Sequence, residues 1–561
     1  MRELLQPLFK ISDRPWFLFL NGILVFFLLN GIFSSFRCKA DLSRSGRFLI
    51  TESTKKVLSD LDSTLYIDAF YSSEIPGEYK SRLELTKGLL KEIASVGKEN
   101  VSLRFHDPDH SEEDSRKAIE LGLEPQILQR TSRDSASVKQ AFLGIVLTLG
   151  HKTEVLPLAF FTEELEYQIL NALRKMLRRD KDSGIALLRT KGSLSLQEHD
   201  SPKDRIGIFF RQILPAEYGP ISEIDLETEE IPEGVELLFW AGSGPLSNQA
   251  AWRLDQFLMG GGSLLLLAKS MDFQTGTKRG GFGLLSGELA PGLAQKDPES
   301  EDLIRFLEHY GIRINHDIVL DPDNSLPMGS LIEIEPGVLG KYPYPPWIVS
   351  ERKTNSLDPE SQFTKNQASL LFPWPSSITL LPEKQKEAKL QALAHSGPDA
   401  EARTEPISLG EKQILSAPIR ANGGPFILSA LAKGKFSSYF SDKKMLIPKG
   451  SKQEILETKP NQVSKILVFG SPYLASDLLA FPEFLEILKN SNIPFLLNSI
   501  DLLRGETDLI QARSKQSAIL KMKPLPFGWE TTISLFHLLG IPALLSLYAF
   551  RRLRKRNKQI L

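Results

Sequence analysis

Three glycines at positions 260–262 stand before a serine and an apolar run, FLMGGGSLLLLA (257–268), and glycine-rich loops can hold phosphate groups. A phosphate-binding loop follows a strand and precedes a helix, so that the helix N-terminus faces the anion. Here a predicted helix comes first and a predicted strand comes last. We therefore predict that the glycines end a helix and turn the chain into a buried strand. No G-x-x-x-x-G-K-S/T motif occurs in the sequence, so we expect no ATP hydrolysis by this chain.

Ser243 lies in a predicted strand-to-helix turn, AGSGP (241–245), which is the position of the nucleophile in α/β hydrolases. That nucleophile turn has the pattern G-x-S-x-G, whereas positions 241 and 245 are alanine and proline. A dinucleotide fingerprint would need more glycines than GSG supplies. We interpret the segment as a tight turn and keep a ligand contact by Ser243 as the alternative.

The motif HDPD (106–109) follows a predicted strand, and His106, Asp107 and Asp109 are residue types that ligate metals. Strand ends are also where ligands bind in α/β proteins. However, Asp-Pro-Asp is common turn chemistry, and no second cluster of histidines and carboxylates has ligand spacing. We favour a turn and predict no metal and no cofactor, with a ligand contact by the two aspartates as the alternative.

Aromatic residues in KYPYPPWIV (341–349) and LFPWP (371–375) include Trp347 and Trp374. These side chains could form a platform for a carbohydrate or peptide, or they could pack a loop onto its domain, which we favour. The single cysteine, Cys38, excludes an internal disulfide, and SSFR before it does not fit a lipoprotein signal.

Two apolar segments are long enough to cross a membrane. Residues 16–36 and 531–550 contain no formally charged residue, and we interpret both as membrane helices rather than as a cleaved signal and a core helix. A basic tail follows the second segment: Arg551, Arg552, Arg554, Lys555, Arg556 and Lys558. Positive residues favour the cytoplasmic side. We therefore expect an inner-membrane protein of a bacterium, with both ends in the cytoplasm and residues 37–530 on the periplasmic side.

The composition argues for globular domains without a nucleic-acid partner. The chain has 561 residues, of which 41% are hydrophobic, and a net charge of -1. This charge gives no global basic field to attract a nucleic acid.

Between the two membrane segments, apolar runs alternate with helical patterns, which predicts α/β domains with mostly parallel sheets. In the first part, we predict strands at 65–71, 101–107 and 142–150 and helices at 78–95, 112–121 and 165–177. The second part begins with a strand at 184–189. It continues with a helix within 203–214, a strand at 235–242, a helix at 249–259 and a last helix near 495–505. Residues 351–424, and 381–406 above all, are polar and predict an exposed insertion or mobile loop.

These features divide the chain into seven predicted segments. They are a short cytoplasmic segment (1–15), a membrane helix (16–36), a first α/β domain (37–180), a second α/β domain (181–510), a juxtamembrane linker (511–530), a membrane helix (531–550) and a basic tail (551–561).

Several segments together resemble the gliding-motility-type ABC transporter auxiliary family. In the first domain they are DLSRSGRFLITESTKKVL (41–58), LYIDAFYSSEIPGEYKSRLELTKGLLKEIA (65–94), VSLRFHDPD (101–109) and LEYQILNALRKM (165–176). In the second they are IPEGVELLFWAGSGPLSNQAAWRLDQFLMGGGSLLLLAKSMD (231–272), LEHYGIRINHDIVLD (307–321), LAKGKFSSYF (431–440) and FLLNSIDLLRGETDLIQAR (495–513).

This resemblance implies a membrane-anchored, extracytoplasmic and non-catalytic subunit that works with a separate permease and ATPase. It implies tandem Rossmann-like domains, the second similar to glutamine amidotransferases, and no catalytic residues to assign. The chain has RTKGS (189–193) where the family often has a Thr-Gly-His-Gly-Glu-like turn, so a ligand bound there in relatives could be lost. The alternatives are an envelope scaffold that binds carbohydrate or peptide and a degenerate amidotransferase-like hydrolase.

Overall fold

The computed structural model describes most of residues 50–513, and isolated positions 531, 534, 548 and 551. Within 50–513 the gaps are 133–134, 178–182, 198–200, 274, 277–289, 328–331, 336–337, 341–342, 405–406, 443–446, 449–456, 458–461, 507–508 and 511. Residues 16–36, Cys38 and the basic residues after Arg551 lie outside the described residues, as does almost all of 531–550. Among the helices that are described, none is both long and apolar enough to span a bilayer.

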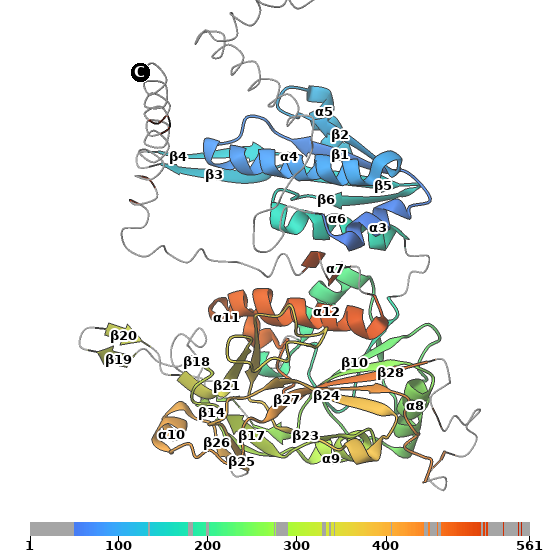
Figure 1. Ribbon diagram of the computed structural model, residues 1–561, viewed down its shortest axis with the longest axis vertical. Coiled ribbons are helices and arrows are strands. Elements are labelled where there is room, and N and C mark those ends of the chain that lie inside the picture. Colours follow the sequence, from blue (N-terminus) through green and yellow to red (C-terminus); the bar gives the residue numbers. More distant parts are fainter. Residues whose placement is uncertain are drawn as a thin grey trace, which may run out of the picture. The chain divides into compact units, whose positions relative to one another are not determined.

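The chain forms two compact units, Met1–Ser517 and Ala518–Leu561, and every element named below belongs to the first. It is a mixed α/β structure with several sheets (Figure 1). The first sheet has the order β2-β1-β5-β6, in which β2 is parallel to β1 while β5 and β6 are antiparallel to their neighbours. The expected mostly parallel arrangement is therefore wrong for this sheet, because two of its three strand pairings are antiparallel.

The predicted elements of this first region are confirmed. They are β1 (Leu65–Tyr71), α4 (Gly77–Gly97), β2 (Val101–His106), α5 (Glu112–Glu120), β5 (Leu143–Leu149) and α6 (Thr162–Leu177), joined by α3 (Glu52–Ser59), η1 (Lys98–Asn100) and β6 (Lys152–Leu156). Side chains of α3, α4 and α6 share one core with alternate residues of β1, while Ala118 of α5 packs with Phe70 in a second core. A hairpin that we did not predict, β3 (Gln126–Ser132) and β4 (Ser135–Ala141), precedes β5.

The large sheet has the order β16-β23-β27-β28-β11-β10-β7-β9, and β24 also pairs with β27. Its strands β9, β7, β10, β11 and β28 are parallel, whereas β27, β23, β24 and β16 are antiparallel to their partners. The sheet is therefore mixed, with a parallel half and an antiparallel half. The parallel strands are β7 (Ile185–Leu188), β9 (Ser222–Ile224), β10 (Leu237–Ser243), β11 (Ser263–Ala268) and β28 (Ser464–Phe469), and the others are β16 (Ile312–Ile314), β23 (Ile378–Leu380), β24 (Ala388–His395) and β27 (Ile427–Gly434).

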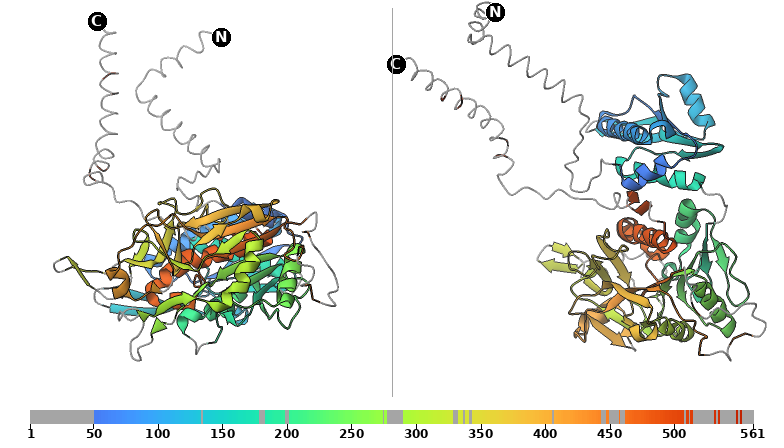
Figure 2. Two further views of the ribbon diagram at one scale, coloured as in Figure 1. Left: turned by 90° about the horizontal axis from the view of Figure 1, so that it is seen from below. Right: turned by 45° about the vertical axis from the view of Figure 1, so that its right-hand side comes forward.

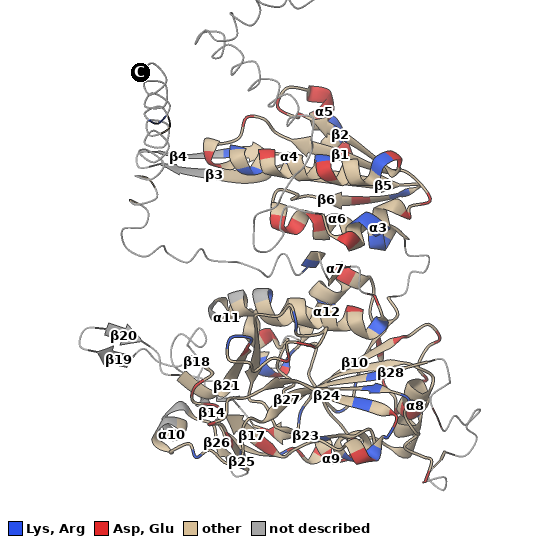
Figure 3. Cartoon of the chain, viewed as in Figure 1, with Lys and Arg blue, Asp and Glu red and all other residues tan. Residues whose placement is uncertain are grey.

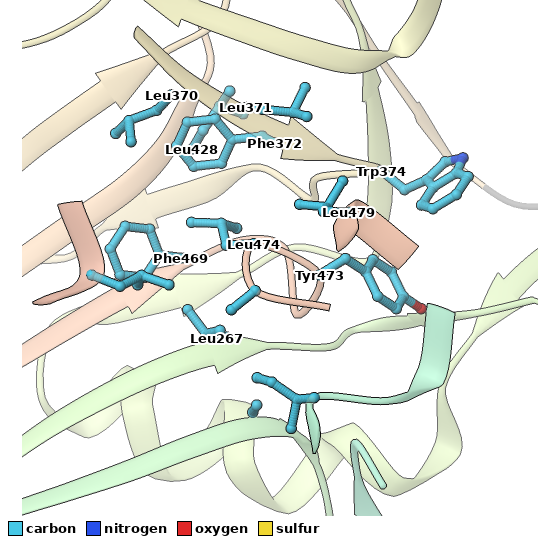
Figure 4. Close-up of a cluster of buried hydrophobic side chains, with 14 of the residues drawn as sticks. Leu267, Leu370, Leu371, Phe372, Trp374, Leu428, Phe469, Tyr473, Leu474 and Leu479 are labelled. Atoms are coloured by element: carbon cyan, nitrogen blue, oxygen red, sulfur yellow. The ribbon is translucent and has the colours of Figure 1, made fainter. Parts of the chain in front are cut away.

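Both faces of this sheet are buried, which explains why its parallel strands are continuous apolar runs. Along β10, Phe239 faces one core while Leu238 and Trp240 face the other. Helices α8 (Asn248–Met259) and α9 (Glu301–His309) contribute to the second of these cores, and α11 (Pro482–Ile487) and α12 (Ile493–Arg504) to the first. Figure 2 shows the same elements from two further directions. Figure 4 shows part of the first core, where Leu267 and Phe469 of neighbouring strands lie near Phe372 and Leu428.

The predicted insertion at 351–424 is wrong. Residues 381–406 include β24, which forms a long pairing with β27 inside the main sheet, and β25 (Glu401–Thr404), which pairs with β17 (Asp317–Leu320). Most of β24 is only half-buried, and it lies within residues 381–406, which are rich in charged and polar residues. A short, half-buried strand within such a segment gives only a weak hydrophobic pattern.

Smaller elements complete the second region. Strands β21 (Pro343–Glu351), β22 (Ser369–Pro373) and β18 (Ser325–Pro327) form one small sheet. The others are β8 (Gly192–Ser193), η2 (Pro202–Asp204), η3 (Phe209–Ile213), α7 (Leu214–Tyr218), β12 (Met271–Asp272), β13 (Thr275–Gly276), β14 (Ala290–Pro291), β15 (Leu293–Lys296), η5 (Pro298–Ser300), β19 (Ile332–Glu335), β20 (Val338–Gly340), η6 (Pro382–Lys384), β26 (Ile407–Ser408), α10 (Glu411–Ser416), η8 (Asp477–Ala480) and η9 (Leu488–Asn492).

Candidate functional site

The carboxyl ends of β7, β10, β11 and β28 meet at one edge of the large sheet, because these four strands are parallel. Ligands of open α/β sheets bind at this edge. The chain places Ser243 at the end of β10 and Lys269 directly after β11, and Tyr473 follows β28. Lys203 comes from η2, and its Nζ lies near the hydroxyl of Tyr473. We take this polar cluster as the candidate functional site.

Ser243 is fully buried and its hydroxyl donates to Asp297 Oδ2 over 2.5 Å. A Cβ on Gly192 of β8 would lie only 2.5 Å from Ser243 Oγ, so the β8 backbone packs directly against this hydroxyl. A serine nucleophile must be reachable by its substrate and have a base to accept its proton. This burial favours the tight-turn interpretation of AGSGP, in which Ser243 holds Asp297 in place.

Replacing Ser243 by alanine is expected to lower the free energy of unfolding by about 1–3 kcal/mol, because the buried Asp297 carboxylate loses a donor. Urea unfolding of the full-length protein would measure this loss. Ser73→Ala is a suitable control, because the Ser73 hydroxyl meets His110 at an exposed position. A Ser243→Ala protein that kept its stability but lost a hydrolytic activity would restore the nucleophile interpretation.

Lys203 is a buried cation, with only 2% of its surface exposed. It forms an ion pair with Asp204, and its Nζ lies 3.4 Å from the Tyr473 hydroxyl and 4.6 Å from the ring centroid of Phe273. Burial lowers the pKa of Lys203, although the charge of Asp204 opposes this shift. Figure 4 shows the Tyr473 ring among the core side chains, with its hydroxyl at the border of that cluster.

The lowered pKa of Lys203 has a consequence for stability at alkaline pH. Between the folded-state pKa and the ordinary value of 10.5, the unfolded chain binds a proton that the folded chain does not. The contribution of Lys203 to stability must therefore rise with pH through this window. We expect the stability difference between wild type and Lys203→Met to shift in favour of wild type from neutral to alkaline pH, as measured by urea unfolding. A constant or falling difference would contradict this assignment.

Lys269 completes the charge balance of the cluster. Its Nζ lies 2.8 Å from Asp272 Oδ1 and 3.7 Å from Asp297 Oδ2. Burial alone would lower the pKa of Lys269, but the hydrogen bond to Asp272 and the charges of Asp297 and Asp272 raise it. The same contacts outweigh burial for Asp272 and lower its pKa. The two lysines thus meet carboxylates already present in the chain, an arrangement that suits packing and charge balance better than nucleophilic chemistry.

Asp107 and Asp109 hold the two loops at the ends of β1 and β2 together. Asp107 Oδ1 accepts from the Ser73 backbone amide at 3.2 Å, and Asp109 Oδ2 accepts from that of Glu74 at 2.8 Å. The hydroxyl of Ser72 also donates to Asp109. Within the described part of the chain, no group of three or more histidine, cysteine, aspartate or glutamate residues could hold a metal ion. These bonds favour the turn interpretation of HDPD.

Trp347 and Trp374 lie in the core, with 0% and 2% of their surfaces exposed. Their rings meet edge to face at 5.1 Å, and Trp374 Nε1 donates to the hydroxyl of Tyr344. The packing alternative for these aromatics therefore agrees with the structure, and an exposed aromatic platform does not.

Glycines 260–262 connect α8 to β11 as predicted, and Gly261 has a φ of 95°. Their amides donate to the carbonyls of Gln256, Leu258 and Phe257, so none is directed at a ligand. The glycines line a cleft of about 1090 Å³ at the amino ends of the strands. The C-termini of α8 and α12 lie in its lining, and helix C-termini disfavour anions. This cleft does not have the features of a phosphate site.

Sequence reasoning missed Lys203, Lys269 and Asp297. A lysine directly after an apolar strand, as in LLLLAKSMD (264–272), was a signal for Lys269, because its backbone position must lie at the ligand-binding edge. No local signal identifies Lys203 or Asp297. They reach the cluster from η2 and from the residue before η5, through contacts between distant parts of the sequence.

One comparison with known proteins relates this chain to transport. A family model described as an ABC-type uncharacterized transport system matches residues 182–499, more than half of the 561 residues. A model described as a domain of unknown function (DUF7088) matches residues 44–148. An "Uncharacterized protein" of Borreliella burgdorferi (strain ATCC 35210 / DSM 4680 / CIP 102532 / B31) is 24% identical over 450 residues, which cover 79% of this chain and 78% of that protein.

Similarities to solved structures are weak. The mmIFT52 N-terminal domain has 14% identity and a TM-score of 0.30, covering 57% of this chain and 97% of its own. A ThuA-like protein from Bacteroides uniformis ATCC 8492 has 10% identity and a TM-score of 0.29, covering 58% of this chain and 93% of its own. TM-scores this low do not establish a shared fold or a shared activity.

Proposed function

We propose a transport-associated role for this chain, because it belongs to the family described as an ABC-type uncharacterized transport system. Within that role, the chain is a non-catalytic auxiliary subunit of an ABC-type transporter. It presents its α/β domains on the periplasmic side to a substrate or to envelope partners. The match of the family model to residues 182–499 is the observation that carries this proposal.

We infer the membrane anchors, the separate ATPase and the non-catalytic role from the sequence and from the candidate site. Segments 16–36 and 531–550 supply the membrane anchors and contact lipid, and a separate ATPase supplies ATP hydrolysis because the chain has no phosphate-binding loop. The burial of Ser243 and the paired lysines support a non-catalytic role. The gliding-motility type within the family stays a prediction.

Affinity purification of the full-length protein in mild detergent tests this function, with mass spectrometry of the proteins that accompany it. We expect a polytopic permease and an ABC ATPase in amounts comparable to the tagged chain. The matched control is the same purification in a harsh detergent, which should remove both partners. Recovery of the chain alone under mild conditions, or with envelope polymers only, would contradict the proposal.

A further inference from the structure

A short segment, residues 509–513, follows α12 in the sequence and packs against α6. Its described residues, which are 509, 510, 512 and 513, are helical and buried. Leu509 and Ala512 share a small core with Tyr167 and Leu170 of α6. This core is distinct from the larger one that α6 shares with α3, α4 and β1. The segment therefore covers a second face of α6.

Arg513 connects this segment to two helices at once. Its side chain is only 2% exposed. Its Nη1 donates to Asn498 Oδ1 at 2.7 Å and to Asp501 Oδ2 at 2.9 Å, and both acceptors belong to α12. Its Nη2 donates to the Tyr167 hydroxyl of α6 at 3.2 Å. One guanidinium group thus bonds to α6 and to α12 together.

Further polar contacts surround Arg513. Arg174 of α6 pairs with Asp501 at 3.0 Å, and the Tyr167 hydroxyl also bonds to Glu217 of α7. Asp501 is fully buried and contacts both arginines. Figure 3 colours the charged positions of α6, α7 and α12, the helices that supply these groups. The contact between α6 and α12 is therefore a buried polar network, and Arg513 links its tyrosine to its central carboxylate.

This network favours two states of the segment over any intermediate one. A buried guanidinium that loses its carboxylate is strongly destabilised, whereas an arginine that leaves the protein is solvated by water. The segment therefore either stays docked or leaves together with Arg513. The docked state is not fully satisfied, because Arg513 Nε is buried and has no hydrogen-bond partner among the described residues. A buried donor without an acceptor lowers the stability of the docked state and makes release easier.

We propose that residues 509–513 form a latch, which holds α6 against α12 while it is docked and lets the two helices separate when it leaves. The latch precedes the second compact unit in the sequence, and that unit begins at Ala518. A displacement of the chain beyond residue 513 therefore acts on the latch before it acts on α12. The two family models match residues 44–148 and 182–499, so neither description covers the latch.

Distances between spin labels, measured by double electron–electron resonance on the full-length protein in detergent, test the latch. Cys38→Ser removes the single native cysteine. The first label pair, Ser95→Cys in α4 and Gln249→Cys in α8, reports the separation between the α6 side and the α12 side of the latch, and both positions are exposed. The second pair, Gln249→Cys and Lys384→Cys, lies entirely on the α12 side.

Arg513→Glu should release the latch, because it places a carboxylate beside Asp501. We expect the ratio of released to docked molecules to rise by about 100-fold or more, as for the loss of one partner of a buried ion pair. The first label pair should then show longer and broader distances, while the second pair stays unchanged. Arg116→Glu is the matched control, because Arg116 is 72% exposed, and it should change neither pair.

Unchanged distances of the first pair in Arg513→Glu would overturn the proposal. Broadening of both pairs would overturn it as well, because it would show that the segment supports the whole structure instead of joining two parts of it. Arg513→Lys keeps the charge but loses the guanidinium fork, so it should release fewer molecules than Arg513→Glu, and equal release would also contradict the latch. No transporter partner takes part in these measurements, so failure here leaves the proposed transport role unaffected.

Discussion

Asp501→Ala is expected to lower the free energy of unfolding by about 3–5 kcal/mol, the largest effect of any single charge removal that we predict. The Asp501 side chain is fully buried in α12 and bonds to Arg174 at 3.0 Å, to Arg513 at 2.9 Å and to the Tyr218 hydroxyl at 2.9 Å. Arg513 is itself only 2% exposed. Removal of the carboxylate leaves two guanidinium groups of one sign without their shared partner. Urea unfolding, followed by tryptophan fluorescence, measures the change.

An exposed ion pair provides the control for Asp501. Glu52 lies 2.7 Å from Lys55 but is 83% exposed, so Glu52→Ala should change stability by less than about 1 kcal/mol. A double-mutant cycle with Arg513→Ala should show strong coupling, because the second change removes the charge that the first left unpaired. Additive effects in this cycle, or an Asp501→Ala loss as small as that of Glu52→Ala, would show that these groups do not form a buried network.

Trp347→Ala is expected to cost about 3–5 kcal/mol through loss of a large buried side chain. The indole ring lies 5.1 Å from Trp374 and 4.8 Å from Phe484, measured between ring centroids. Among the described residues, Nε1 of Trp347 has no hydrogen-bond partner, so Trp347→Phe loses packing without breaking a hydrogen bond seen there and should cost clearly less. Denaturant midpoints of the two variants measure this order. Full stability of Trp347→Ala, together with loss of carbohydrate or peptide binding, would instead support an exposed platform.

Local patterns predicted the elements of this fold well where each element buries a strong apolar face. In α6, Leu165, Ile169, Leu173 and Met176 repeat at helical spacing, and all four are buried in the core that α6 shares with α3, α4 and β1. The apolar run of β11 and the glycines before it also predicted a buried strand that follows the end of a helix. Pairing was not predictable in the same way, because β5 and β27 turn back antiparallel through contacts that no local pattern encodes. Strand β24 lies in a segment rich in charged and polar residues, 381–406, and this segment was therefore mistaken for an insertion.

The candidate site was predictable only in part, because its partners are distant in sequence. Ser243 could be placed at a strand end from AGSGP alone, but its acceptor is 54 residues away in Asp297. The sequence pattern also gave no sign that Lys203 would pack against Tyr473, 270 residues later. Burial distinguishes a structural serine from a reactive one. Ser243 is buried because the backbone of β8 packs against its hydroxyl.

Cross-linking of the full-length protein in intact cells tests the transport role most directly, since it reports neighbours before any extraction. An amine-reactive cross-linker followed by peptide mass spectrometry would identify the proteins near lysines of residues 50–513. We predict cross-links from these lysines to the extracytoplasmic loops of an ABC permease, and co-recovery of its ATPase through that permease. Cross-links confined to the chain itself, or to envelope proteins without any transporter component, would contradict the assignment as an auxiliary transport subunit.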